Sequence, residues 1–390
     1  MIEGKKLGEA GRVLRYGMIG GGPGSFIGGV HRGAIKLEGA AELVAGCFSR
    51  KLEDNLAVGQ DLGIPKERVY ANYETMAQEE AKREDGIDFV VIAAQNMVHF
   101  AASKAFLENG INVMCEKPLT TNLSDALELK RIADANGCLF GVSYSYAFHV
   151  MVLEARERIL RGEIGDVINV MGEYPQEWLI DLMEQSEQRQ AAWRTDPQQA
   201  GLSNCVGDIG THIEHMVSFM TGLKIRRLCA KLDVLGEGRK LDTNAHILLE
   251  YDNGASGHYW CSQVAVGYDN GLKVRIFGTK GAIEFVQEQS NYLRVTQKGC
   301  PPQTFSRGNG YITSQAAAFS RVPSGHPEGY HEAFANLYRA YCDAVRKKLD
   351  GIEINESEVF YPTLEAGIDG VRFITKCVES SGQGAVWVDM

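Results

Sequence analysis

The sequence predicts an α/β protein with two domains: an N-terminal doubly wound parallel sheet, and a C-terminal α/β domain with a large, mainly antiparallel open sheet. Three observations lead to this prediction. Short apolar runs alternate with helical patterns as far as Tyr146, which is typical of a parallel sheet with helices on both faces. A glycine-rich turn follows the first apolar run directly. Beyond Tyr146, strand-like runs joined by tight turns predominate, which is typical of antiparallel pairing.

Chain length sets the expected number of domains. The 390 residues exceed what one hydrophobic core usually supports, so we divide the chain into residues 1–146 and 147–390. The composition, 44% hydrophobic and 23% charged, is ordinary for a globular protein. The net charge of −10 argues against a nucleic acid or an anionic membrane surface as the main partner.

The placement of cysteine and histidine argues against a metal site and for a cytoplasmic protein. The nine cysteines show no C-x-x-C spacing, so neither a zinc site nor a secreted disulfide framework is expected. Free thiols are typical of a reducing cytosol. His212 and His215 share a helix face, but without a third ligand no metal is expected. Residues 1–15 carry no signal-peptide pattern, and no apolar run is long enough to span a membrane.

The N-terminal domain alternates strands and helices along the chain. Apolar runs predict strands at residues 13–19, 42–47, 89–94, 112–115 and 139–143. Helical patterns between them predict helices at residues 28–37, 51–62, 99–109 and 124–136. Ser124 is the expected N-cap of the last helix, and Gly137 lies just beyond its end. Right-handed crossovers then place all of these strands in one parallel sheet.

The C-terminal domain begins with a helix at residues 152–160 and continues mainly as strands. We expect the strands at residues 167–174, 225–235, 245–251, 256–264, 273–277 and 283–287. The segments 252–254 (DNG) and 278–281 (GTKG) are hairpin signals. Two late helices are expected at residues 331–347 and 364–380. The intervening residues 301–327 are rich in Gly, Pro and Ser, which predicts an ordered loop or lid.

A phosphate-binding loop is the first candidate site. Residues 20–25 read GGGPGS and follow the first strand, where glycines let backbone N–H groups approach a pyrophosphate at a helix N-terminus. Ser25 stands where a third glycine is usual, and Gly28 takes that place if Pro23 to Ser25 are an insertion. The position between a strand and a helix predicts a dinucleotide site of the Rossmann type. The alternative is a glycine-rich turn with no ligand.

The end of the second strand bears on the choice of cofactor. NAD-specific domains often place an Asp or Glu there to bind the ribose 2′-OH, whereas this chain has Cys47, Phe48, Ser49 and Arg50. Ser49 and Arg50 fit a 2′-phosphate, as in NADP enzymes. The alternative is a solvated turn in which Arg50 faces water. The sequence therefore leaves NAD and NADP open.

Two further motifs carry charged groups suited to acid–base chemistry. Residues 116–118 (EKP) follow the fourth strand, at the sheet edge where open α/β sheets bind ligands. Pro118 fixes the turn there, and a cis bond is one way to do so. Asp208 and His212 lie four residues apart on one helix face, where the pair can orient and deprotonate a substrate oxygen. Taken singly, Lys117 fits a surface residue, and the other pair fits a helix N-cap with a core histidine.

Together and in this order, the motifs resemble the glucose–fructose oxidoreductase / inositol dehydrogenase family, Gfo/Idh/MocA. The resemblance covers nearly the whole chain and implies a Rossmann domain followed by a substrate-binding domain that packs into a homodimer or homotetramer. It implies an NAD- or NADP-dependent enzyme that moves a hydride between the cofactor and a secondary alcohol or ketone of a sugar, inositol or sugar derivative. The markers are the loop 20–28, Asn96, His99, residues 116–118, Trp193, Arg194, Asp208 and His212.

The resemblance also implies roles for individual residues. The catalytic group is Lys117, Asp208 and His212. The substrate-binding residues are Lys117, Tyr144, Tyr146, His149, Asp208 and His212. The cofactor-binding residues are Gly20, Gly22, Gly24, Ser25, Phe26, Ile27, Ser49, Arg50, Gln95, Asn96, His99, Glu116, Lys117, Trp193 and Arg194. Two departures from the family pattern bear on the cofactor: the inserted loop residues, and Gln95 where a proline is usual.

In the expected mechanism His212 accepts the hydroxyl proton, Lys117 stabilises the alkoxide and Asp208 keeps the geometry. The sequence does not rank Asp208, which raises the pKa of His212, against Lys117 and burial, which lower it. Two alternatives remain on the same fold. One is an NAD-dependent glycosidase or dehydratase that oxidises its sugar only transiently, and the other is a sugar-sensing regulator without catalysis. Stoichiometric NADH release separates all three.

Overall fold

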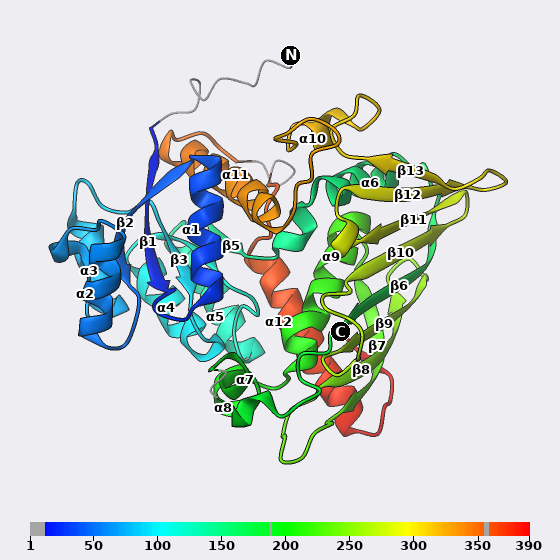
Figure 1. Cartoon of the computed structure of the whole chain (residues 1–390), viewed down its shortest axis with the longest axis horizontal. Coiled ribbons are helices and arrows are strands. Elements are labelled where there is room, and N and C mark those ends of the chain that lie inside the picture. The colour runs from blue at the N-terminus through cyan, green and yellow to red at the C-terminus, as the bar shows by residue number, and fades with distance from the viewer. Residues whose placement is uncertain (1–11, 187–188, 355–358) are drawn as a thin grey trace.

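The computed structural model describes residues 12–186, 189–354 and 359–390. It contains two sheets, with several helices lying between them (Figure 1). Residues 1–11, part of the stretch in which the sequence predicts no signal peptide, lie outside the described residues. Among the described helices, none combines the length and apolar character that crossing a bilayer requires.

The first sheet is parallel and five-stranded, as the sequence predicts. Its order is β2-β1-β3-β4-β5, and the central strand β3 is fully buried, which explains its continuous apolar run. A one-residue parallel bridge from Gly46 to Val69 continues the sheet beyond β2. The strands are β1 (Leu14–Gly20), β2 (Ala41–Cys47), β3 (Phe89–Ala93), β4 (Asn112–Cys115) and β5 (Phe140–Val142).

Helices cover both faces of this sheet, so the fold is doubly wound. The helices are α1 (Phe26–Glu38), α2 (Leu52–Asp61), α3 (Tyr73–Lys82), α4 (Asn96–Glu108) and α5 (Leu123–Ala135). Sequence analysis did not predict α3, and it began α4 three residues late. The prediction of Ser124 as an N-cap is wrong. Asn122 caps α5, because its side-chain oxygen accepts the backbone N–H of Asp125 at 2.9 Å.

The second sheet has nine strands in the order β13-β12-β11-β10-β6-β9-β8-β7-β14. Its pairs are antiparallel except β6 with β9, which is parallel, so the prediction of a mainly antiparallel sheet is confirmed. Sequence analysis did not predict β12, β13 or the short β14. The strands are β6 (Val167–Pro175), β7 (Ile225–Asp233), β8 (Asn244–Tyr251), β9 (Ser256–Ser262), β10 (Lys273–Gly278), β11 (Gly281–Val286), β12 (Tyr292–Gln297), β13 (Gln303–Ser306) and β14 (Val388–Asp389).

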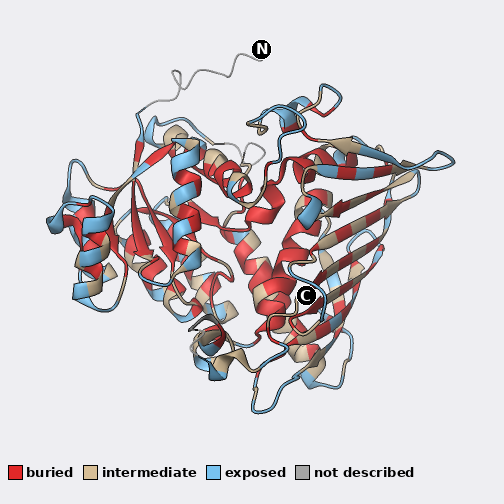
Figure 2. Ribbon diagram, viewed as in Figure 1, coloured by how far each residue is buried: buried red, intermediate tan, exposed pale blue. Residues whose placement is uncertain are grey.

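Among the described residues, helices lie on one face of the second sheet (Figure 1). Residues of α6, α9 and α12 share a buried hydrophobic cluster with residues of its strands, and buried residues are red in Figure 2. The helices of this region are α6 (Val150–Leu160), α7 (Arg189–Arg194), α8 (Pro197–Ala200), α9 (Thr211–Thr221), α10 (Ser314–Ala317), α11 (Tyr330–Leu349) and α12 (Leu364–Gly382). A π-helical turn, Val206–Gly210, leads directly into α9. Short 3₁₀ turns occur at Lys66–Arg68, Ser145–Phe148, Met183–Gln185 and Gln287–Gln289.

Residues 301–327, predicted to form an ordered loop or lid, contain β13 and α10. The carboxylate of Glu154, buried on α6, accepts the backbone N–H of Thr313 at 2.7 Å and its hydroxyl at 2.8 Å. Arg307, buried as well, pairs with Glu328 at 2.8 Å. Breaking such buried contacts would leave unpaired polar groups, so the segment is an ordered loop and not a movable lid.

Helix α11 belongs to the C-terminal half of the chain but packs on the first sheet. Its residues Leu337 and Tyr338 join Val30 of α1 in the hydrophobic cluster over that sheet. Helix α12 also touches both units: Ile368 packs near α5, and Phe373 belongs to the cluster of the second sheet. The division at residue 146 therefore stays a prediction, because two C-terminal helices complete the N-terminal core.

Candidate active site

A cavity of about 1180 Å³ lies where β1, β3 and β4 end. It extends from the glycine loop to Tyr174 of β6 and to Asn270, which precedes β10. The strand order reverses between β1 and β3, which is where open α/β sheets bind ligands. The volume exceeds the roughly 300–1,000 Å³ of a pocket for one drug-sized molecule, so a dinucleotide and a small substrate can share it.

The glycine loop has the geometry of a dinucleotide cradle. Gly20 and Gly24 both have φ of 79°, a region that favours glycine. A Cβ atom on Gly28 would lie 2.3 Å from the Cα of Gly21, so Gly28 supplies the close approach expected of the third glycine. Ser25 caps α1 by accepting the Gly28 N–H at 3.3 Å. The loop therefore presents a helix N-terminus to the cavity, which suits a pyrophosphate.

The turn after β2 brings in an acid that sequence analysis missed. Asp54, at the start of α2, lines the cavity together with Ser49 and Arg50. Its carboxylate accepts the Ser49 hydroxyl at 3.1 Å. Fully buried Asn55 fixes the turn, because its side-chain oxygen accepts the backbone N–H groups of Phe48 and Ser49 at 2.6 and 2.7 Å. The acid comes from the helix and not from the strand end, which is why inspection of the strand end overlooked it.

Lys117 and Asp208 meet in the middle of the cavity. The Lys117 ammonium donates to the Asp208 carbonyl at 2.7 Å and to its carboxylate at 3.0 Å. The other carboxylate oxygen accepts from Gln263 at 3.1 Å and lies 3.4 Å from Arg194. Burial would raise the pKa of Asp208, but the charges of Arg194 and Lys117 prevail and hold that pKa well below its usual value. The carboxylate therefore stays ionised and fixes the position of the ammonium group.

His212 lines the same cavity and is nearly buried. Its ring lies edge-on to Tyr146, with ring centroids 4.7 Å apart, and 5.8 Å from the ring of Tyr144. Burial first, and the charge of Lys117 second, lower the pKa of His212 well below its usual value, while Asp208 opposes them. The imidazole is thus neutral near pH 7, the form that can accept a proton.

The turn that carries Asp208 is held by a second buried acid, Asp242. Its two carboxylate oxygens accept the backbone N–H groups of Asn204 and Val206 at 3.0 and 2.9 Å. Asn204 also donates to Gln263 at 2.6 Å, which orients that amide toward Asp208. The interpretation of Asp208 as a helix N-cap is therefore wrong. The Asp242 carboxylate accepts the backbone N–H groups of this turn, whereas the Asp208 carboxylate binds Lys117.

Glu116 is the centre of a buried hydrogen-bond chain behind Lys117. It accepts from His31 at 2.9 Å, from the Ser143 hydroxyl, and from the Lys117 backbone N–H at 3.2 Å. His31 in turn contacts the Tyr338 hydroxyl at 2.6 Å. Burial would raise the pKa of Glu116, but the contacts with His31 and the charge of Lys117 lower it overall. An ionised, fixed carboxylate therefore borders the cavity beside Lys117.

Hydroxyl and amide groups form the opposite wall. The Tyr174 hydroxyl lies 3.0 Å from that of Tyr146 and donates to Asn270 at 2.6 Å. Asn270 also accepts from Gln176 at 2.8 Å and donates to Gln287 at 3.2 Å. All five side chains line the cavity. Sequence analysis found only Tyr146, because the other four lie at separate strand ends that no motif connects.

The structure brings most of the expected residues to the cavity surface. Three others lie behind it. Tyr144 is buried and bonds Thr211 at 2.8 Å, and burial lowers the pKa of His149 to about 4. His99 lies 2.9 Å from the carbonyl of Pro118, which follows Lys117 through a cis bond. The expected residues that line the cavity are Gly20, Gly22, Gly24, Ser25, Phe26, Ile27, Ser49, Arg50, Gln95, Asn96, Glu116, Lys117, Tyr146, Trp193, Arg194, Asp208 and His212.

Tyr144, His149 and His99 do not line the cavity, so the ligand contacts that the resemblance implies for them stay predictions. Each lies beside a lining residue, and the ring of His149 is 6.2 Å from that of Tyr146. His99 braces the turn of Lys117, and Tyr144 stacks on His215 at 4.2 Å between ring centroids, beside His212. These contacts depend on how the chain packs, and motif position alone does not reveal them.

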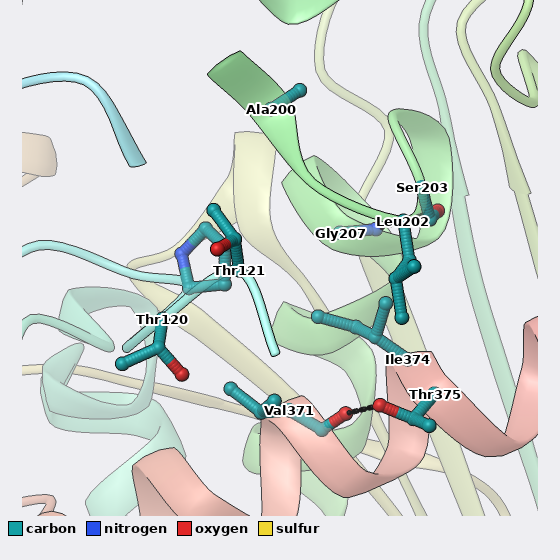
Figure 3. Close-up of a pocket in the computed structure, with 10 residues that line it drawn as sticks. Thr120, Thr121, Ala200, Leu202, Ser203, Gly207, Val371, Ile374 and Thr375 are labelled. Atoms are coloured by element: carbon teal, nitrogen blue, oxygen red, sulfur yellow. Dashed lines mark hydrogen bonds between the residues drawn. The ribbon is translucent and has the colours of Figure 1, made fainter. Parts of the chain in front are cut away.

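A second, much smaller cavity lies between the turn after Pro118 and helix α12 (Figure 3). Thr121, Ala200 and Ile374 are among its lining residues. Its volume is about 10 Å³, which is at most the space of one water molecule. The ligand site is therefore the large cavity.

The fold and the cavity together define a dinucleotide-dependent oxidoreductase. Two family models match the chain: residues 14–144 fit the oxidoreductase family with an NAD-binding Rossmann fold, and residues 152–284 fit the GFO/IDH/MocA C-terminal domain. The uncharacterized oxidoreductase YfiI of Bacillus subtilis is 38% identical over 100% of this chain and 99% of its own. The chain belongs to the Gfo/Idh/MocA family.

Solved structures agree with this assignment. An inositol dehydrogenase homolog from Azotobacter vinelandii, complexed with NAD+, is 36% identical and covers 100% of both chains with a TM-score of 0.95. An inositol dehydrogenase homolog from the same organism, complexed with NADH and myo-inositol, is 35% identical and covers 98% of both chains, with a TM-score of 0.91. The resemblance stated from the motifs is thereby confirmed.

Proposed function

We propose that this protein is an NAD-dependent dehydrogenase that oxidises a secondary alcohol of a sugar or polyol, or reduces the matching ketone. One observation carries the proposal. The Lys117–Asp208 pair and the neutral imidazole of His212 share one cavity with the glycine loop. A proton acceptor and a fixed positive charge are thus available at the place where the cofactor and an alcohol would meet.

The chain's own residues supply the proton chemistry. His212 accepts the proton of the reacting hydroxyl, since burial keeps its ring neutral. Lys117 donates to the same oxygen and stabilises the developing alkoxide. Asp208, held ionised by Arg194 and Lys117, keeps the ammonium in place. A nicotinamide cofactor bound along the glycine loop supplies the hydride acceptor.

The wall of hydroxyl and amide groups supports a polyhydroxylated substrate. Tyr146, Tyr174 and Asn270 offer donors and acceptors but no charge, which suits neutral ring hydroxyls better than a carboxylate or phosphate. The Azotobacter homolog crystallised with NADH and myo-inositol supports the same class. We propose a cyclic polyol or pyranose as the substrate.

Asp54 supports NAD over NADP. Its carboxylate lines the cavity beside Ser49, where it can accept ribose hydroxyls and would repel a 2′-phosphate. This revises the expectation drawn from the end of β2, which left both cofactors open. Arg50 lines the same region and lies on the exposed side of the turn.

Two further expectations remain proposals. A homodimer or homotetramer is supported by the second sheet, on whose outer face no helix lies within the described part of the chain (Figure 1), and light scattering of the purified protein tests it. A cytoplasmic location rests on the cysteine usage, with all nine cysteines free in the structure, and cell fractionation tests it.

The experiment that tests the function is a panel assay with inositols, aldoses and glycosides. We expect NADH to form in a 1:1 ratio with oxidised substrate for at least one cyclic polyol or sugar. Product formation without net NADH would instead indicate transient oxidation by a glycosidase or dehydratase. Tight binding of a sugar without any turnover would indicate a sensor.

A further inference from the structure

Tyr330, the first residue of α11, reaches the active cavity from the C-terminal part of the chain. Its ring is stacked on Phe26, the first residue after the phosphate loop, with centroids 6.3 Å apart and an interplanar angle of 14°. On the other side it lies 5.8 Å from the ring of Tyr146. Tyr330 therefore joins the cofactor side of the cavity to the hydroxyl and amide wall.

The backbone beside Tyr330 is held firmly in place. Asn291 makes two bonds to Glu328, donating to its carbonyl at 2.8 Å and accepting its N–H at 2.9 Å. The Glu328 carboxylate pairs with Arg307 at 2.8 Å. Glu332 accepts the N–H of residue 329 at 2.8 Å, which caps α11. These contacts position the tyrosine before any ligand arrives.

The Tyr330 hydroxyl, in contrast, has no partner within the described part of the chain. Tyr146, Tyr174 and Asn270 are hydrogen-bonded to one another, and Lys117 is bound to Asp208, whereas no hydrogen bond from a described residue reaches this phenol. Burial, with smaller effects of Tyr146 and nearby carboxylates, raises its pKa. The group therefore stays protonated and can donate a hydrogen bond to a ligand.

We propose that Tyr330 is a specificity-determining residue whose hydroxyl donates a hydrogen bond to a substrate hydroxyl other than the one oxidised. The inference rests on the proposed polyol dehydrogenase function and deepens it. Lys117 and His212 engage the reacting oxygen, so a second donor must address another position on the ring. The contact with Tyr146, a member of the polar wall, puts the phenol beside the substrate, and an oriented donor that a substrate must match discriminates against analogues that lack the matching group.

The test uses Tyr330→Phe, which keeps the ring and removes only the hydroxyl. We expect kcat/KM for the best polyol to fall about fivefold to tenfold, the loss of one neutral hydrogen bond. The affinity for NAD, measured by fluorescence titration, should not change. Among singly deoxygenated analogues of the substrate, one should be turned over equally well by the wild type and the variant. Tyr311→Phe is the matched control, since that exposed hydroxyl bonds Ser306 at 2.8 Å outside the cavity.

Three results would overturn the inference. One is a Tyr330→Phe enzyme with wild-type kcat/KM on the best polyol. Another is an equal loss on every deoxygenated analogue, which would mark a packing role. A third is weakened NAD binding, which would place the hydroxyl on the cofactor. Calorimetry of the NADH complex with the same panel separates these from failure of the function itself: a wild type that neither binds nor oxidises any polyol overturns both proposals.

Discussion

At the scale of single residues, burial and the charge of Lys117 together decide the protonation of His212. Burial and the lysine charge both oppose the protonated ring, and Asp208 is already engaged by Lys117, Gln263 and Arg194. The sequence left this balance open. Since the resulting pKa lies well below the usual value of about 6.5, the base is ready at neutral pH without any partner removing its proton.

The pH dependence of the reaction should reflect this low pKa. Because His212, as the proposed base, must be deprotonated to act, kcat/KM for oxidation should be level from about pH 7 to 9 and fall only in the acid range. Ketone reduction needs the protonated ring, so it should rise as the pH falls through the same range. Rate profiles in both directions, with a primary deuterium effect to show that chemistry limits the rate, provide the measurement.

The variant Lys117→Gln provides a control for the predicted pH profile. In Lys117→Gln the positive charge is gone, so the NMR titration of His212 should move upward toward the usual histidine value. Two results would contradict the conclusion that burial and Lys117 outweigh Asp208 in setting the pKa of His212. One is a wild-type oxidation rate whose rise with pH is centred at or above pH 6.5, and the other is a His212 titration that is unchanged in the variant.

Asp54 gives a prediction about cofactor choice. In Asp54→Asn the carboxylate that we propose binds the ribose is neutralised, so the ratio of kcat/KM with NADP to that with NAD should rise about tenfold, equivalent to roughly 1.4 kcal/mol. Glu53→Gln is the matched control, because Glu53 is the residue next to Asp54, is exposed and does not line the cavity. Similar ratios in the two variants would show that Asp54 does not read the ribose.

The sequence predicts the local parts of this site and misses the distant ones. Lys117, Asp208 and His212 sit in short motifs, so pattern alone identifies them. Asp242, Gln263 and Tyr330 act through contacts with residues 36 to 304 positions away, so only the fold reveals them. Asp54 illustrates a third case, in which the expected chemistry is present but comes from the neighbouring helix.

At the scale of elements, helix α1 contains two neighbouring glycines, Gly28 and Gly29, one of which can serve as a control for the other. A Cβ on Gly28 would lie 2.3 Å from the Cα of Gly21, whereas a Cβ on Gly29 would meet nothing within 4 Å. Gly28→Ala should therefore displace the phosphate loop and weaken NAD binding at least tenfold. Gly29→Ala should leave binding unchanged and raise the free energy of unfolding by about 0.5–1 kcal/mol.

Fluorescence titration with NADH and chemical denaturation measure the two effects. If Gly28→Ala bound NADH normally, the close approach would not matter for the cofactor.

Elements differ in how well the sequence predicts them. Long periodic segments such as α1 are correct to within two residues at either end, whereas α3 and β12 were missed because each buries only two apolar side chains.

At the scale of the whole molecule, the N-terminal sheet depends on the far end of the chain. Phe334 and Tyr341 of α11 lie in the cluster that covers one face of that sheet. The backbone N–H of Val142 in β5 donates to the carbonyl of Pro362 at 2.8 Å. Residues 1–146 therefore lack part of their own core, although the alternation of strands and helices predicts a self-contained domain.

A fragment of residues 1–146 tests this dependence. Without α11 it exposes the apolar side chains that α1 and β3 turn toward that helix, so we expect it to bind a hydrophobic dye and to unfold without a sharp transition. The full chain serves as the control. A fragment that unfolds cooperatively and binds NADH would show that the boundary at residue 146 marks an independent domain.

The same arrangement has a consequence for the order of events in the cell. A ribosome completes β5 long before it reaches α11, and at roughly 5–20 residues per second the delay is on the order of ten seconds or more. During that time one face of the nascent sheet has α1 on it but lacks the contacts of α11. The emerging chain is thus a natural client for holding chaperones, and the cofactor cannot settle into a finished site until translation is nearly over.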